Sequence, residues 1–94
     1  MDFVLLKGKD FSEPFNFKNA HGKSIAMPNG TYRVVLERGT WAHEYTIGNG
    51  LARTRTNITW TIPAEESANF AYNVMYYTLY LNDDELARGV LRVQ

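Results

Sequence analysis

A chain of 94 residues is long enough for one domain with one modest hydrophobic core. The absence of cysteine excludes disulfides and thiolate metal sites, and the formal net charge of zero argues against a coat for nucleic acid or for an anionic membrane. The start of the chain carries Asp2 where a secretory leader would be basic, and no apolar run approaches the length of a membrane span. We therefore expect synthesis in the cytoplasm and no membrane partner.

Apolar segments separated by glycine and proline run through the first half of the chain, which indicates short strands joined by turns. The expected segments are strands at Phe3–Leu6, residues 11–18 and Thr31–Arg38, a short return strand or extended piece at 24–27, and turns at 19–23 and 28–30. Pro14 restricts the second strand to a sheet edge or a bulge, because proline has no N–H for a central ladder. Alternation in the Thr31–Arg38 strand places Tyr32, Val34 and Leu36 on one face.

The middle of the chain predicts a hairpin. Trp41–Ile47 alternates as a strand, with Trp41, His43, Tyr45 and Ile47 on one face. Residues 48–50 read Gly-Asn-Gly, and both residue types tolerate the left-handed backbone that a hairpin turn requires. We therefore expect residues 51–55 to pair back on the preceding strand.

The clearest pattern begins at Ile58. Ile58, Trp60 and Ile62 alternate with threonines, which predicts a half-buried strand that Pro63 ends. Residues 63–70 are the only helical candidate, because proline suits the first helical position and glutamates suit the positive end of the helix dipole. Two further strands follow.

The last two strands form the closing hairpin. Val74–Leu81 is rich in aromatic and β-branched residues, which favours a strand. Residues 82–85 read Asn-Asp-Asp-Glu and predict a turn, after which Leu86–Val93 forms the final strand.

These elements predict an all-β protein with a single domain over residues 1–94. We expect an antiparallel β-sandwich, Ig-like, of about seven short strands, with one helical turn near 63–70. A five-stranded barrel is the alternative. The candidate core residues are Ile58, Trp60, Ile62, Tyr77, Leu79 and Leu81.

The sequence offers no catalytic or metal-binding set. His21 lies in a predicted turn, and His43 shares a strand face with Trp41 and Tyr45, which predicts a packed or interfacial ring rather than a base. The acidic run at 83–85 lacks the ligand spacing of a calcium loop. We therefore expect a protein that is not an enzyme and has no catalytic residues, metal, cofactor or small-molecule substrate.

A basic patch is the only sign of nucleic-acid binding. Arg53 and Arg55 would project to one face of a strand, and Arg33 and Arg38 add to the positive charge. Grooves for single-stranded nucleic acid combine such charges with aromatic rings. Because acidic residues balance the charge overall, an ordinary polar strand face or a protein contact is favoured.

The strand Val74–Leu81 is apolar on both of its faces. Met75, Tyr77, Leu79 and Leu81 form the face with pure aliphatics, which we expect to be core. The other face then presents Val74, Tyr76 and Tyr80 outward. Cover by a loop, a protein interface and a carbohydrate platform are the three uses of such a face. The candidate interface residues are Val74, Tyr76, Tyr80, Trp41 and Tyr45.

Several short motifs resemble one family. They are Asn19-Ala20-His21-Gly22-Lys23-Ser24-Ile25 after a phenylalanine-rich strand, Gly30-Thr31-Tyr32-Arg33-Val34, the Pro-Ala-Glu-Glu-Ser turn within 58–68, and Gly89-Val90-Leu91-Arg92-Val93. The chain is similar in this pattern to small β-sandwich domains of tailed-bacteriophage virions, such as the N-terminal domain of upper baseplate proteins.

The resemblance implies a structural virion protein without catalysis, in the tail, baseplate or neck. Its partners would be other virion proteins and further copies of itself, and it would be made in the host cytoplasm and end in the virion. The alternatives are a capsid decoration or head protein, and a small carbohydrate- or nucleic-acid-binding β-module.

Overall fold

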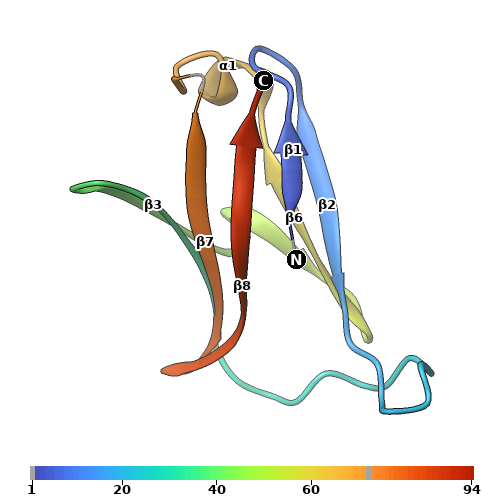
Figure 1. The fold of residues 1–94 in the computed structure, drawn as a ribbon. Helices are drawn as coiled ribbons and strands as arrows, with labels where there is room; N and C mark the ends of the chain where they lie inside the picture. Colours follow the sequence, from blue (N-terminus) through green and yellow to red (C-terminus); the bar gives the residue numbers. More distant parts are fainter. Residues whose placement is uncertain (1, 72) are drawn as a thin grey trace.

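The computed structural model describes residues 2–71 and 73–94, and it consists almost entirely of strands (Figure 1). In chain order the strands are β1 (Phe3–Leu5), β2 (Phe11–Asn16), β3 (Tyr32–Arg38), β4 (Trp41–Ile47), β5 (Gly50–Arg53), β6 (Asn57–Ile62), β7 (Val74–Leu81) and β8 (Asp84–Val93). One short helix, α1 (Ala64–Ser67), lies between β6 and β7.

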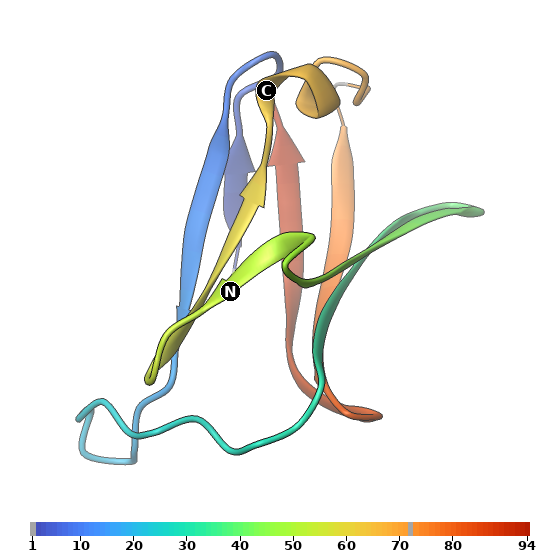
Figure 2. The same ribbon diagram turned by 180° about the vertical axis from the view of Figure 1, so that it is seen from behind.

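All eight strands belong to one sheet, in the order β1-β8-β7-β3-β4-β5-β6-β2. The two edge strands, β1 and β2, lie side by side in both views, so the sheet curls until its edges almost meet (Figures 1 and 2). Contacts between rings cross this gap, because Phe3 lies 5.5 Å from Phe15 and 6.0 Å from Phe11 between ring centroids. The result is a nearly closed barrel with its core inside.

The core is a cluster of aromatic rings around Trp60. This side chain is fully buried, and its ring lies 5.2 to 6.3 Å from five other rings, those of Phe3, Phe11, Phe15, Tyr45 and Tyr77. The alternation in β6 and β7 has the phase that the sequence predicts, since Ile58, Ile62, Tyr77 and Leu79 are also buried. Leu81 is half-buried and packs against the cluster. Large aromatic surfaces therefore supply much of the burial that stabilises this small domain.

The all-β class is confirmed, whereas the Ig-like sandwich is not. A sandwich has two separate sheets, but here β4 and β5 join both halves into one continuous sheet. The barrel alternative is closer in kind, although the sheet has eight strands rather than five.

The predicted hairpin between β4 and β5 is wrong. β5 runs parallel to β4, with Thr46 opposite Gly50 and Ile47 opposite Leu51. The N–H of Asn49 donates back to the carbonyl oxygen of Thr46, at 2.8 Å, so the chain makes a tight loop and resumes its direction. Positive φ angles at Gly48 and Gly50 permit this loop, and the same two glycines suggested a hairpin. β5 then pairs antiparallel with β6.

The helix is shorter than the predicted 63–70 and begins differently. Pro63 is the extended residue before the helix rather than its first residue, and the N–H of Ala64 donates to Asp10 Oδ1 at 2.7 Å. Ser67 is fully buried, accepts a hydrogen bond from the Gly8 N–H at 3.0 Å and donates to the Lys9 carbonyl oxygen. These bonds tie α1 to the loop between β1 and β2, at one end of the barrel.

One open alternative is decided and one further boundary differs from the prediction. Residues 24–27 are the extended piece rather than the short strand, and they are held by a bridge between Lys18 and Ser24 and by backbone bonds from Ile25 to Phe17 and from Met27 to Arg55. β8 begins at Asp84 instead of Leu86, after a turn in which Asn82 has a positive φ of 54°.

Candidate functional site

The outward side chains of β7 and its neighbours form an apolar surface, which we call the tyrosine face. It comprises Val74, Tyr76, Thr78 and Tyr80 of β7 with Val90 of β8 and Val35 of β3. Met75, Tyr77 and Leu79 of β7 point inward and are buried. Tyr76 is 61% exposed, whereas Val74 and Tyr80 are half-buried.

Tyr76 lies at the middle of this face. The register places it opposite Val90 on one side and Glu37 on the other. Tyr80 is less available for a contact, because the Arg33 guanidinium carbon lies 4.1 Å above its ring centroid. Arg33 is held there from the next strand, since its Nη1 lies 3.9 Å from Glu44 Oε2.

Charged side chains border the tyrosine face on both sides. Arg92 lies opposite Val74 on the β8 side, and Glu37 lies opposite Tyr76 on the β3 side. Neither forms an ion pair within the part of the chain that the structure describes, whereas Arg88 Nε lies 3.6 Å from Glu85 Oε2. The face therefore has an apolar centre with a free cation on one border and a free anion on the other.

The residues of the second predicted face, on β4, differ in their exposure to solvent. Tyr45 is only 2% exposed and belongs to the core, so its place among the interface candidates is corrected here. β4 enters the barrel wall at its C-terminal end, while its start extends beyond the barrel in a hairpin with β3 (Figures 1 and 2). Trp41, near the tip of that hairpin, is 42% exposed. A flat carbohydrate platform that includes both Trp41 and Tyr45 is therefore not present.

A hollow lies beside Tyr45, below α1, and three polar side chains meet in it. The Tyr45 hydroxyl donates to Glu66 Oε1 at 2.7 Å, and His43 Nε2 lies 3.9 Å from the same oxygen. Residues 48–52, Thr61 and Pro63 complete the lining. Burial first, and then the hydrogen bond to the Glu66 carboxylate, raise the pKa of Tyr45 well above its usual range. This arrangement can accept a hydrogen-bond donor, but its phenol is fixed as a protonated structural group.

Sequence reasoning missed this contact. Glu66 was assigned to the start of a helix, and His43 to a packed or interfacial ring. In the structure the His43 ring is stacked parallel to Trp41, with 6.2 Å between centroids, and meets Tyr45 edge to face at 4.6 Å. The alternation in β4 indicated these ring neighbours, but no local pattern connects residue 45 with residue 66.

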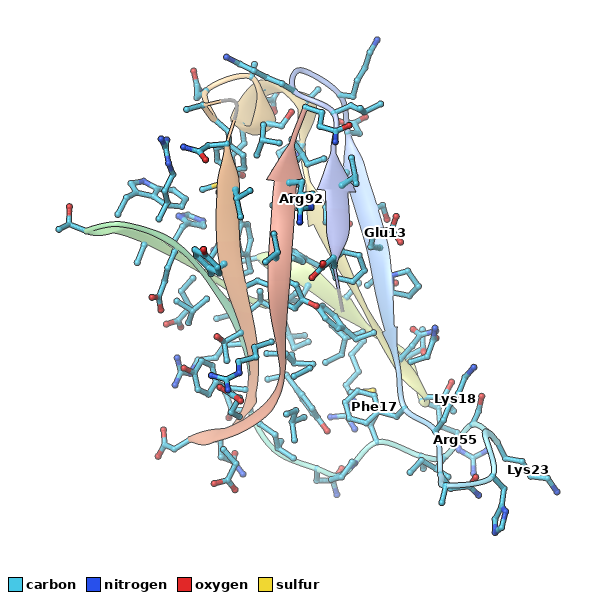
Figure 3. All side chains as sticks on the ribbon, viewed as in Figure 1. Glu13, Phe17, Lys18, Lys23, Arg55 and Arg92 are labelled. Carbon is cyan, nitrogen blue, oxygen red and sulfur yellow. The ribbon has the colours of Figure 1, made fainter. Side chains whose placement is uncertain are left out.

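The predicted basic patch is not a continuous surface. Arg53 Nη2 donates to the carbonyl oxygens of Met27 and Pro28, at 3.3 and 3.4 Å, and the guanidinium lies over the Tyr32 ring. This arginine holds the long connection between β2 and β3 against the barrel. Arg55 instead lies with Lys18 and Lys23 at the lower end of the molecule (Figure 3).

The remaining candidates are dispersed. His21 lies exposed in the turn after β2, where its N–H donates to Asn19 Oδ1. Asp83 and its acidic neighbours form the exposed tip of the β7–β8 hairpin. Across residues 2–71 and 73–94, no group of three or more histidine and acidic side chains is arranged to hold a metal ion.

None of the described helices has the length and apolar character to span a membrane. Neither the models of protein families nor the curated proteins nor the solved structures contain a match to this chain.

Proposed function

We propose that this chain is a structural protein without catalytic activity, which acts by binding other protein chains through the tyrosine face. The observation that carries this proposal is the position of Tyr76, which is 61% exposed at the centre of an apolar surface. Tyrosine is enriched at protein interfaces, because its ring contributes a large apolar area and its hydroxyl can still find a partner. An apolar patch with a charged border is typical of such a contact.

The charges at the border favour a second copy of the chain as one partner. Arg92 and Glu37 lie on opposite sides of the apolar centre. A twofold axis parallel to β7 at Tyr76 would bring the β8 side of one copy over the β3 side of the other, so that the long Arg92 side chain of each copy comes within two residues along the strand of a Glu37. The net charge of zero also leaves little long-range repulsion between copies.

The motifs that resemble tailed-phage virion domains support a place in a virion. Within this proposal the protein is a component of the tail, baseplate or neck, bound to other virion proteins, and a position on the capsid is the alternative. The fold part of the proposal is that the barrel is a closed form of the sandwich of those domains. Its support is that β6 and β7 face each other across the core, with the rings of Trp60 and Tyr77 5.6 Å apart.

The double variant Tyr76→Ser, Tyr80→Ser tests the contact. We expect circular dichroism to show an unchanged fold, while sedimentation velocity shows association weakened at least tenfold, alone and with neighbouring virion proteins. Tyr76→Ser alone should account for most of the loss, because Arg33 covers Tyr80. Trp41→Ser, which removes an exposed aromatic ring elsewhere, is the matched control. A double variant that stays folded and assembles as the wild type does would refute the tyrosine face as the contact.

A further inference from the structure

The barrel is open along part of one line, which we call the seam. β8 runs from Asp84 to Val93, but β1 pairs only with Leu91, Arg92 and Val93. β2, the other edge strand, pairs with β6 on its far side. Below β1, no strand formed by the described residues therefore lies between β2 and residues 84–89 of β8. Figure 1 shows that no strand is drawn between the lower parts of β8 and β2.

An apolar hollow lies in the seam. Its lining is mainly apolar and comprises Phe15, Asn16, Phe17, Lys18, Leu79, Leu86 and Ala87. Its volume is about 210 Å³. Phe15 and Leu79 belong to the buried core, whereas Leu86 is 43% exposed. Figure 3 shows the Phe17 ring in this opening, between β8 and β2. The hollow thus connects the core with solvent.

The edge of β8 carries backbone groups that can pair with an added strand. The N–H of Gln94 donates to the Leu5 carbonyl oxygen, and the N–H of Val90 donates to Asp2 Oδ1 at 3.2 Å. Even-numbered residues of β8 therefore direct their N–H and C=O groups toward β1 and the seam. The next even-numbered residue, Arg88, lies beyond the end of β1. Asp2 takes the place of a further strand residue at Val90. Within residues 2–71 and 73–94, no group covers the backbone N–H of Arg88 in the same way.

The facing edge of β2 is unsuited to the same role. The N–H of Phe17 donates to the Thr56 carbonyl oxygen on the β6 side, at 2.9 Å. Odd-numbered residues of β2 therefore pair with β6, and even-numbered ones face the seam. Pro14 is one of these and has no N–H to offer. An added strand would pair with β8 and only pack its side chains against β2.

The charges at the two ends of the seam would orient a strand that bound there. Lys18 lines the hollow at the lower end of the seam, whereas Lys23 and Arg55 lie beyond β2 at the lower end of the molecule (Figure 3). Among the described residues none of the three forms an ion pair. At the upper end, the Asp2 carboxylate borders the seam. A segment that is acidic at its lower end and uncharged near Asp2 would match both ends.

We propose that the seam binds an extended segment of another protein chain, which adds to β8 as a strand in line with β1. One apolar side chain of the segment would fill the hollow over Phe15, Phe17 and Ala87, and its acidic residues would lie beside Lys18. Strand addition of this kind takes its affinity from main-chain hydrogen bonds and its specificity from the side-chain pocket. The proposal is independent of the tyrosine face, which lies on the outer surface of β7.

The test uses synthetic peptides as probes. An acetylated peptide Thr-Val-Thr-Val-Asp-Glu, and the reversed sequence for the opposite strand direction, are titrated by fluorescence anisotropy. We expect one of the two to bind saturably and to slow hydrogen exchange of the Arg88 amide, measured by NMR. The same peptide with two lysines in place of its acids should bind at least tenfold more weakly. Equal binding of the lysine peptide, or no binding of either acidic peptide, would overturn the proposal.

Variants of the protein locate the site. Lys18→Glu should weaken binding several-fold, whereas Lys9→Glu, in the β1–β2 loop at the other end of the barrel, should not. Arg88→Pro should abolish binding by removing the N–H, and Leu86→Ser tests the hollow if the proline variant does not fold. Tyr76→Ser should leave peptide binding unchanged, so a failure of the tyrosine face is distinguishable from a failure of the seam.

One result would replace the proposed partner. If neither peptide binds, but the Arg88 amide becomes protected as the protein concentration rises, the occupant is a second copy of this chain. Peptide binding that survives in Arg88→Pro with unchanged affinity would show that the edge of β8 is not the site.

Discussion

The buried hydroxyl of Tyr45 donates a hydrogen bond of 2.7 Å to Glu66, a residue on the one short helix. Tyr45 lies in the barrel wall and is 2% exposed, while the Glu66 carboxylate is about one-third exposed at 32%. The bond therefore fixes α1 against β4, next to the loop that connects β4 with β5. The Tyr45 ring itself packs against the buried Trp60 ring, at 5.5 Å between centroids, so Tyr45 belongs to the core rather than to a binding surface.

Tyr45→Phe should remove this bond without creating a cavity. Because the acceptor is charged, we expect a loss of about 1.5–3 kcal/mol in the free energy of unfolding at neutral pH. Urea denaturation monitored by tryptophan fluorescence measures this value. The control is Tyr76→Phe, which removes the hydroxyl of an exposed tyrosine and should change stability by less than about 0.5 kcal/mol.

The same tyrosine predicts the response to alkaline pH. Its pKa is raised in the folded state, by burial first and by Glu66 second, whereas an unfolded tyrosine ionises near pH 10. Its contribution to stability is therefore complete below about pH 10 and is lost progressively as the pH rises above that value. Burial also raises the pKa of Tyr77, so Tyr45→Phe should reduce the alkaline slope without abolishing it. An unchanged slope between pH 9 and 11 in this variant would contradict the assignment.

The sequence predicted the strand phases well, because the period of two is a local property. Ile58, Trp60 and Ile62 are fully buried, and Tyr76 points outward, as alternation requires. The path from β4 to β5 was not predictable, since Gly48 and Gly50 allow a hairpin and a parallel loop equally. The closure of one sheet into a barrel depends on pairings between strands that are far apart in the sequence.

Among the candidate sites, too, some residues could be predicted from local patterns and others depend on the fold. Tyr76 could be named from the apolar character of both faces of one strand. The exposure of Trp41 and the burial of Tyr45 could not be separated, because they depend on where the hairpin of β3 and β4 leaves the barrel wall. The seam was also hidden, since it arises from the unequal lengths of β1 and β8. Its one local indication in the sequence was Pro14, which predicted that β2 is an edge strand.

Trp60→Ala should destabilise the protein by about 3–5 kcal/mol, since it removes the ring at the centre of the aromatic core. That loss approaches global unfolding for a small domain. Trp60→Phe should cost less, because it keeps an aromatic ring and removes the Nε1–H, which is buried and has no partner among the described residues. Trp41→Ala, at a half-exposed position, should cost about 1 kcal/mol or less. Chemical denaturation curves in which both alanine variants lose the same amount would place Trp60 outside the core.

Gly50→Ala should cost more than Gly48→Ala, although both glycines have a positive φ. A β-carbon at Gly50 would lie 2.5 Å from Tyr45 Cδ1, whereas one at Gly48 would meet nothing within 4 Å. We expect about 1–2 kcal/mol for the left-handed backbone at Gly48. Overpacking against Tyr45 should add about 1–3 kcal/mol at Gly50. The difference between their thermal or urea midpoints measures this close approach, and equal losses would mean that Tyr45 moves aside freely.

Ser67→Ala should loosen the end of the barrel that α1 closes. The Ser67 hydroxyl is fully buried, accepts from the Gly8 N–H and donates to the Lys9 carbonyl oxygen at 2.9 Å. Alanine leaves both loop groups without this partner at a part-buried contact, which should cost about 0.5–1.5 kcal/mol. Asp10→Ala removes the cap of the Ala64 N–H from the same loop and should cost about 0.5–2 kcal/mol.

Hydrogen exchange distinguishes this local effect from a general loss of stability. In Ser67→Ala the Gly8 amide should exchange faster by a larger factor than amides in the middle of β7, since the change acts on the loop between β1 and β2. Ser12→Ala, on the exposed side of β2, is the matched control and should leave the Gly8 rate unchanged. A uniform increase of the exchange rates across β7 and the loop would mean that Ser67 acts through global unfolding. An unchanged rate at Gly8 would mean that its hydrogen bond to Ser67 does not protect this amide.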